Sequence, residues 1–478
     1  MNYRMIKYTL GWILLFETAF LALPAVCAIV YTERAGLAFL YTMLICALAG
    51  SLCLLGKPKN TTLYSKDGFV IVALSWIVLS LFGSVPFMFS GVTKNYIDAL
   101  FETVSGFTTT GASIFSDVEA LPKSILLWRS FTHWIGGMGV LVFIMAFLPL
   151  GGAHNMHIMK AESPGPDVSK LVPRVRQTAM ILYALYISLT LIQLVFLLFG
   201  GMSFFEAINT ALATAGTGGF STKNDSLASY SSYIQIVVTV FMFLFALNFN
   251  SYYLALKLRF KDAFNTEIKV FTAIVIIVTA IVAFDIRDIF GSAGLAIKNA
   301  AFTVVSIISS TGFSVCDFNI WPELSRTLIV LIMFIGACAG STGGGIKVSR
   351  IVILFKGMRR ELYKMIHPKQ VKKITIDKRP VGNEVVRAVN AYIVCYILIF
   401  AASMAIISFN EYDLITNFTS VTTTMNNIGP GLELVGPTSN FGHFDIFSKL
   451  VLIFDMLAGR LELFPMLILF SPRAWRKN

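Results

Sequence analysis

The sequence FETVSGFTTTGA, from Phe101 to Ala112, closes a short apolar helical stretch on a glycine-centred turn. Three later segments repeat this arrangement, namely ATAGTGGF (213–220), ISSTGF (308–313) and MNNIGPG (425–431). The helical stretch before each turn is about 10–14 residues long, whereas crossing a bilayer takes about 20. Non-helical backbone at membrane depth must be buried in protein or line a water-filled path. The repeated turn therefore predicts re-entrant loops around an ion pathway.

The composition is that of a membrane protein. Hydrophobic residues make up 56% of the chain, charged residues only 13%, and the mean hydropathy is +0.75, whereas soluble domains carry about 25% charged residues. The formal charge of +12 does not indicate a nucleic-acid partner, because most Lys and Arg residues fall in alternate loops between apolar spans. The positive-inside rule makes those loops cytoplasmic. We expect a multi-pass protein of the lipid bilayer with both termini in the cytoplasm and an acidic outer face.

The apolar spans group into an amino-terminal hairpin and four similar modules. The predicted units are residues 1–56 for the two-helix hairpin, then 57–160, 161–260, 261–370 and 371–478 for the modules. Outer spans are expected near 69–89, 180–199, 270–284 and 385–409, and inner spans near 126–150, 233–256, 328–355 and 450–470. We therefore predict an all-α polytopic membrane protein with about ten spanning helices, in which four pseudo-repeated helix/pore-loop/helix modules surround one central pore.

The four turns align on one glycine each. They then read TTGA (109–112), GTGG (216–219), STGF (310–313) and NIGP (427–430). Glycine adopts the positive φ that turns successive carbonyls the same way, and it leaves the axis free of side chains. Rings of carbonyls can replace the hydration shell of a bare cation. The predicted cation filter consists of Thr109, Thr110, Gly111, Thr217, Gly218, Ser310, Thr311, Gly312, Asn427, Ile428 and Gly429.

A polar residue stands nine positions before each aligned glycine. These residues are Glu102, Asn209, Thr303 and Ser420. One Thr-Gly turn alone is typical of a helix end or a surface turn. Four turns at equivalent places, each with the same upstream polar position, favour a repeated pore helix.

The third inner span is interrupted by GACAGSTGGGIKVSR (336–350), which holds too many glycines for a continuous membrane helix. A phosphate-binding loop is not predicted, because Ile346 separates Gly345 from Lys347 and breaks the GxxxxGK pattern. We interpret the segment as a plug in a broken helix that lies across the pore inside the filter. The predicted gate residues are Gly340, Ser341, Thr342, Gly343, Gly344, Gly345 and Lys347.

Arg460 stands within the last apolar span, where an ionisable group faces a partner or an aqueous cavity. One interpretation pairs it with Asp455 or Glu462. The functional interpretation places its fixed positive charge beside the pore, where it opposes a resident cation and forms a barrier.

Other polar residues support weaker hypotheses. His133 and Arg129 are expected to pack and anchor the first inner span, and His154 with His157 lacks a third ligand for a metal site. A membrane-embedded enzyme that uses Glu102 or Asp117 with His133 as acid and base would leave the four turns unexplained. We therefore do not expect an enzyme.

With these motifs in place, the chain resembles the Trk, Ktr and HKT superfamily of potassium transporters over essentially its whole length. The four filter turns, the GSTGGGIK loop (340–347) and the GRLE segment (459–462) carry the resemblance. The additional amino-terminal hairpin is similar to the TrkH-type branch. One departure is Ile428 with Pro430 in the fourth turn, where the other turns suggest Thr-Gly.

The resemblance implies a homodimer in the bacterial cytoplasmic (inner) membrane, with one pore in each protomer that takes up potassium. Glycine at all four filter positions is associated with potassium selectivity in the family. Members work with a cytosolic, nucleotide-binding regulatory subunit of RCK domains (TrkA-like), and this chain has no dinucleotide fingerprint of its own. A sodium-conducting or ion-coupled symporter of the same architecture stays open as the alternative. Replacing Gly111 by Ser is expected to admit more sodium.

Overall fold

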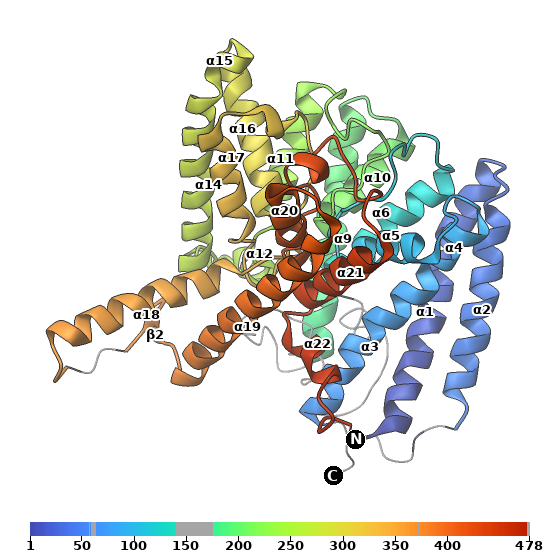
Figure 1. The fold of residues 1–478 in the computed structure, drawn as a ribbon, viewed down its shortest axis with the longest axis horizontal. Coiled ribbons are helices and arrows are strands. Elements are labelled where there is room, and N and C mark those ends of the chain that lie inside the picture. The colour runs from blue at the N-terminus through green and yellow to red at the C-terminus, as the bar shows by residue number, and fades with distance from the viewer. Residues whose placement is uncertain (57, 59–63, 140–174, 371–372, 476–478) are drawn as a thin grey trace.

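The computed structural model describes residues 1–56, 58, 64–139, 175–370 and 373–475 and is almost entirely helical (Figure 1). Two features of the sequence analysis lie outside these residues: the first inner span beyond residue 139, and the pair His154 and His157. Within the described part the fold is the predicted all-α membrane architecture.

The amino-terminal hairpin consists of α1 (Tyr3–Val30) and α2 (Gly36–Leu54), which lie side by side at one edge of the bundle (Figure 1). The turn between them is not separate from the rest of the fold. The Glu33 carboxylate accepts hydrogen bonds from the backbone N–H groups of Lys123 (2.7 Å) and Ser124 (3.0 Å). These are the first residues of α6 (Lys123–Gly137), so the hairpin caps the first inner helix.

Each module contributes an outer helix, a pore helix and an inner helix. The outer helices are α3 (Ser65–Gly83) continued by α4 (Val85–Phe89), α9 (Val175–Phe199), α14 (Thr266–Asp285) and α19 (Asn383–Ile407). The pore helices are α5 (Tyr96–Phe107), α10 (Phe204–Gly216), α16 (Ala293–Ile308) and α20 (Leu414–Met425). The inner helices are α6, α11 (Ser232–Phe245) with α12 (Phe249–Leu256), α17 (Glu323–Met333) with α18 (Val348–Ile366), and α21 (Ile446–Arg460) with α22 (Phe464–Leu469).

Short elements complete the description. They are α13 (Phe260–Ala263), α15 (Arg287–Phe290), the 3-10 turns η1 (Phe318–Ile320), η2 (Ser408–Asn410) and η3 (Glu433–Val435), and an antiparallel hairpin of β1 (Thr375–Ile376) and β2 (Arg379–Pro380). The β-hairpin lies between α18 and α19, beside the part of α18 that projects from the bundle (Figure 1).

The described residues contain six helices that are long and apolar enough to cross a membrane without a break. They are α1, α2, the α3–α4 pair and the other three outer helices. The second and fourth inner spans, which the sequence predicted as continuous, are interrupted. In the second module α11 and α12 meet at an angle of 90°, and in the fourth the chain turns at Glu462 and Leu463, both with positive φ.

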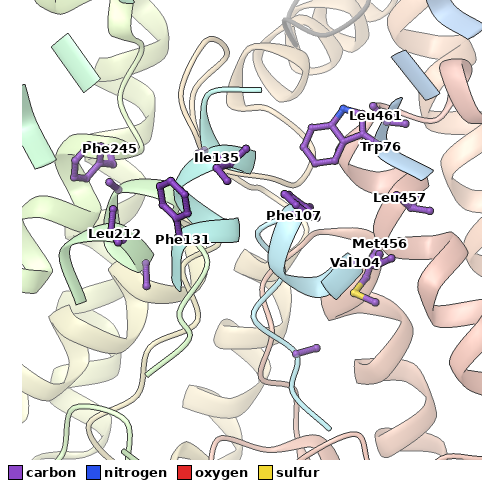
Figure 2. Packing of buried hydrophobic residues seen from close by; sticks show 14 of the residues in the cluster. Trp76, Val104, Phe107, Phe131, Ile135, Leu212, Phe245, Met456, Leu457 and Leu461 are labelled. Carbon is purple, nitrogen blue, oxygen red and sulfur yellow. The ribbon is translucent and has the colours of Figure 1, made fainter. Parts of the chain in front are cut away.

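The core lies where the pore helices contact the inner helices. Figure 2 shows Phe107 of α5 close to Phe131 and Ile135 of α6. The Phe107 ring also meets Trp128 edge-on, with centroids 6.0 Å apart, and the Trp128 indole N–H donates to the Gly83 carbonyl at 3.0 Å. Inside a bilayer no hydrophobic effect drives helices together, because the lipid tails are as apolar as the helix surfaces. Close packing and satisfied hydrogen bonds hold the helices together instead. These contacts fix the position of the first pore helix.

Both ends of the described chain lie at one end of the bundle (Figure 1). The Tyr3 hydroxyl donates a hydrogen bond to the Trp475 carbonyl. The two ends of the described chain are therefore in contact at the same end of the bundle.

Candidate functional site

The four glycine turns share one backbone conformation, which corrects the alignment made from the sequence. Positive φ values occur at Gly111 (+78°), Gly219 (+79°), Gly312 (+82°) and Gly429 (+97°). Two residues before each of them a non-glycine residue also has positive φ: Thr109, Thr217, Ser310 and Asn427. In the second turn the equivalent of Gly111 is therefore Gly219, and Gly218 corresponds to Thr110. The upstream polar position in that module moves accordingly from Asn209 to Thr210.

Hydrogen bonds confirm this register. In each turn the residue before the positive-φ glycine donates its N–H to a carbonyl in the last turn of the pore helix, at 2.9 Å in all four cases. The pairs are Thr110 to Ser105, Gly218 to Ala213, Thr311 to Ser306, and Ile428 to Thr423. Each pore helix thus ends in the same left-handed cap. Its C-terminal end, which carries about half a negative charge from the helix dipole, leads directly into the turn.

The turns contact one another in a closed cycle, which we call the loop ring. A β-carbon placed on Gly111 would lie 1.9 Å from the carbonyl oxygen of Gly218, and one on Gly219 would lie 2.1 Å from that of Thr311. The cycle continues from Gly312 to Ile428 at 2.0 Å and closes from Gly429 to Thr110 at 2.8 Å. Each glycine therefore lies against the carbonyl of the next turn, where no side chain fits.

The outer side of the loop ring opens into a cavity. All four positive-φ glycines line an open space of about 740 Å³, together with polar side chains of the outer loops. Among these, the Asn224 amide donates a hydrogen bond at 2.9 Å to the carboxylate of Asp117 in the same loop region, which holds the pKa of that carboxyl below the ordinary value. The cavity is a water-accessible vestibule over the ring.

Of the four non-glycine residues with positive φ in the loop ring, two have a buried side-chain oxygen without a hydrogen-bond partner within the described residues. These oxygens are Oγ1 of Thr109 and Oδ1 of Asn427, at equivalent positions of the first and fourth turns. The amide nitrogen of Asn427 is satisfied, because it donates to Oγ1 of Thr110 at 3.0 Å and so links the two turns. A buried oxygen without a donor is costly unless another group, such as a cation, binds it.

Glu102 and Arg129 form a buried ion pair behind the first two turns. The Arg129 guanidinium contacts the Glu102 carboxylate at 2.7 Å. The same carboxylate accepts the Ile114 N–H at 2.9 Å, and Arg129 donates to the Ser221 carbonyl at 3.3 Å. Because both charges are paired and hydrogen-bonded, the pair holds the two turns in place.

His133 is also buried between the first two modules. Its Nδ1 lies 2.8 Å from the Gly106 carbonyl and its Nε2 accepts the Phe220 N–H at 3.3 Å. Both ring nitrogens are therefore occupied. His133 and Arg129 are packing and anchoring groups, as the sequence predicted, and the geometry does not offer Glu102 and His133 as an acid and a base.

The glycine-rich segment between α17 and α18 is irregular, as predicted, and packs directly under the loop ring. The Gly344 N–H lies 2.5 Å from Oγ of Ser310, a ring residue. A β-carbon on Gly343 would lie 2.7 Å from the Ser309 carbonyl, and one on Gly344 would lie 2.6 Å from that of Asn426. These contacts require glycine at both positions.

The break between α11 and α12 supplies the opposite wall for this segment. The carbonyls freed at the bend accept hydrogen bonds from it: Ala246 from the Cys338 N–H at 3.1 Å, and Phe245 from the Thr342 hydroxyl at 3.2 Å. The Gly340 carbonyl in turn accepts the Phe249 N–H at 3.0 Å. The sequence analysis missed this break.

Arg460, at the end of α21, binds carbonyl oxygens. Its guanidinium donates to the carbonyls of Thr342 and Gly137, both at 2.8 Å. The acids suggested as its partners have other contacts: Asp455 accepts the Ser403 hydroxyl at 2.7 Å, and Glu462 pairs with Arg350. Arg460 therefore joins the glycine-rich segment to the end of α6.

Lys347 is buried, with 2% of its surface exposed, and its ammonium group donates to the Gly343 carbonyl within the same segment. This contact folds the end of the segment back on itself. Lys347 and Arg460 thus place two positive side chains next to the glycine-rich segment.

Several known proteins are similar to this chain over its whole length. A model of the TrkH family, described as a cation transport protein, matches residues 36–477. The chain is 37% identical over 487 residues to the Trk system potassium uptake protein TrkH of Escherichia coli K12, and 32% identical over 484 residues to the protein TrkG of the same strain. These alignments cover 100% and 99% of both sequences. The crystal structure of the potassium transporter TrkH from Vibrio parahaemolyticus superposes over 100% of both chains, with a TM-score of 0.89 and 33% identity.

Proposed function

The chain belongs to the TrkH family of cation transport proteins, and on that premise we propose that it takes up potassium through the loop ring across the bacterial inner membrane. The observation that carries the proposal is the closed cycle of turns, in which each glycine lies against a carbonyl of its neighbour. Carbonyls held this closely can replace the hydration shell of a bare cation.

The electrostatics of the ring support a cation. Four pore helices end at the turns and direct their negative dipole ends toward the ring. The unpartnered oxygens of Thr109 and Asn427 add ligands on the inner side. The filter then comprises the predicted residues with Gly219 added, and the ions pass between the carbonyls of Thr110, Gly218, Thr311 and Ile428.

The glycine-rich segment, residues 336–347, acts as the gate in this proposal. It lies directly under the ring and is held by the helix ends around it. The positive charges of Arg460 and Lys347 disfavour a cation at this level, so the held segment is a closed state. Opening requires the hydrogen bonds that Thr342 forms with the Phe245 carbonyl and the Arg460 guanidinium to break.

Control of the gate falls to a cytosolic, nucleotide-binding subunit that binds the basic inner surface of a homodimer. The projecting helix α18 carries Lys356, Arg359, Arg360 and Lys364 and offers charge for such a contact. With α18 inside the cell, both termini are cytoplasmic as well, in line with their shared side of the bundle.

Uptake of radioactive rubidium into proteoliposomes with the purified chain tests the proposal. Inhibition by external potassium and not by sodium is the expected result. Equal inhibition by both ions, or by sodium alone, would favour the sodium-conducting alternative, and uptake that depends on a sodium gradient would favour symport.

A further inference from the structure

Glu267, in the first turn of α14, binds both the glycine-rich segment and the start of α18 with one oxygen atom. Its Oε1 accepts the Ala339 N–H at 2.7 Å and the Ser349 N–H at 3.1 Å. Ala339 precedes the six residues Gly340 to Gly345, and Ser349 lies in the first turn of α18. Only 9% of the Glu267 surface is exposed. The function proposed above gives this residue no role.

The contact with Ser349 supplies a cap that α18 otherwise lacks. The N-cap residue of α18 is Lys347, whose side chain makes no capping hydrogen bond. A carboxylate is the favoured partner for the unpaired N–H groups at a helix start, because the positive end of the helix dipole attracts it. Glu267 thus binds the start of α18 from a different helix.

The position of Glu267 is in turn fixed by the β-hairpin on the cytoplasmic side. The Asp377 carboxylate accepts both the N–H of Thr266 at 2.9 Å and its hydroxyl at 2.6 Å. Thr266 is the first residue of α14 and directly precedes Glu267. Asp377 itself is exposed, in the turn between β1 and β2.

The β-hairpin is also bound to the base of α18 and α19. Lys356 donates to the Thr375 carbonyl at 2.8 Å, and Ile374 is buried in a small cluster with Ile353, Val386 and Val389. Direct contacts therefore connect the exposed turn of the β-hairpin to the start of α14, and Glu267 connects the start of α14 to the glycine-rich segment and the start of α18.

We propose that Glu267 is the positioning residue that keeps the gate closed, and that Asp377 transmits to it the position of the cytoplasmic β-hairpin. This inference rests on the gating role proposed for the segment. Opening then requires Glu267 to release Ala339, Ser349 or both. A regulatory partner that displaces the hairpin moves the start of α14 and weakens these bonds, without touching the filter.

Rubidium flux through the purified chain without a partner tests the inference. Glu267→Ala removes both bonds, and we expect flux to rise about tenfold or more, since hydrogen bonds to a charged group contribute at that level. Glu267→Gln keeps an acceptor oxygen but loses the charge, so its increase should be smaller. Glu361→Gln, on the exposed surface of α18, is the matched control and should leave flux unchanged.

A variant at the exposed Asp377 distinguishes a specific effect on the gate from an effect of misfolding. Asp377→Asn is expected to raise flux in the same direction as Glu267→Gln, although it lies outside the segment and at the surface. Selectivity for potassium over sodium should match the unmodified chain in all these variants, because the loop ring is intact. A general loosening of the structure would change selectivity and flux together.

Two results separate this inference from the proposed function. If neither the unmodified chain nor a correctly folded chain that lacks Gly340–Gly345 carries rubidium, the potassium pathway itself is overturned. If that deletion conducts while Glu267→Ala and Asp377→Asn conduct no more than the unmodified chain, the pathway stands and the role of Glu267 is refuted.

Discussion

Replacing Gly111 by Ser introduces a β-carbon at the closest contact of the loop ring. That atom would lie 1.9 Å from the Gly218 carbonyl oxygen, whereas real β-carbons essentially never approach a neighbour closer than 3.0 Å. The contact is with the backbone carbonyl of Gly218, which cannot rotate away as a side chain could. The first and second turns must therefore separate by about 1.1 Å. The same substitution at Gly429 would meet the Thr110 carbonyl at 2.8 Å and requires about 0.2 Å.

Both substitutions strain the backbone, but they differ in how far they displace the neighbouring turn. Both place a side chain at positive φ, which costs about 1–2 kcal/mol. They differ in the displacement of the neighbouring carbonyl, which is about 1.1 Å for Gly111→Ser and about 0.2 Å for Gly429→Ser. We expect the preference for potassium over sodium to fall by at least about tenfold, equivalent to about 1.4 kcal/mol, in Gly111→Ser. Gly429→Ser should lose considerably less.

Gly91 provides the control, because it has φ of +76° but no atom within 4 Å of the added β-carbon. Gly91→Ser pays the backbone cost alone, in the same module, and should keep the selectivity of the unmodified chain. The assay is rubidium uptake into proteoliposomes, with potassium and sodium as competitors over a range of concentrations. The ratio of the two half-inhibitory concentrations gives the selectivity of each variant.

The reasoning fails if Gly111→Ser and Gly91→Ser show the same selectivity in folded, conducting protein. It also fails if Gly429→Ser is the more damaging of the two ring substitutions. Either result would mean that the close approach of the turns does not control which ion passes.

Three further outcomes follow from the structure. Deleting residues 340–345 should raise flux and reduce its dependence on a partner, and lower flux in correctly folded protein would refute the gating role. Arg460→Ala, which removes the bond to the Thr342 carbonyl, should raise flux several-fold in the same assay while selectivity is kept. The hydrogen bond from Asn224 lowers the pKa of the Asp117 carboxyl. The stability that this carboxylate contributes is therefore fully present above the pKa of an unfolded aspartate and is lost as the pH falls through the lower pKa of the folded state. Asp117→Asn should make the thermal unfolding temperature less dependent on pH in this acidic range.

Much of the architecture could be predicted because membranes restrict what a chain can do. Apolar length gave the outer helices, and the short helical stretches before glycine gave the pore helices. The register of the second turn could not be predicted in the same way, because Gly218 and Gly219 are both glycines and either could be aligned with Gly111. What distinguishes them is φ, which is positive only at Gly219, and that follows from the carbonyl of Thr311 against which it packs.

The breaks in the inner helices show a different limit. Glycine marks the third break clearly, whereas the second falls at Asn248 and the fourth at Glu462 and Leu463, shortly before Pro465. Two asparagines inside an apolar span, Asn248 and Asn250, were the available signal for the second. Whether a helix breaks there depends on partners that accept its freed backbone groups, and these come from other modules.

The interruptions are therefore parts of one structure. The end of α11 gives its carbonyls to the glycine-rich segment, the end of α6 gives Gly137 to Arg460, and Arg460 ends α21 while also binding the segment at Thr342. Lipid cannot satisfy the carbonyls freed at the ends of α11 and α6, and these carbonyls bond instead to the glycine-rich segment and to Arg460. The hydrogen bonds that hold the segment to these helix ends and to Glu267 can be exchanged for bonds to water once an aqueous path opens, because the lost bonds are replaced. The same requirement that closes the pathway in this structure thus makes a low-cost opening physically possible.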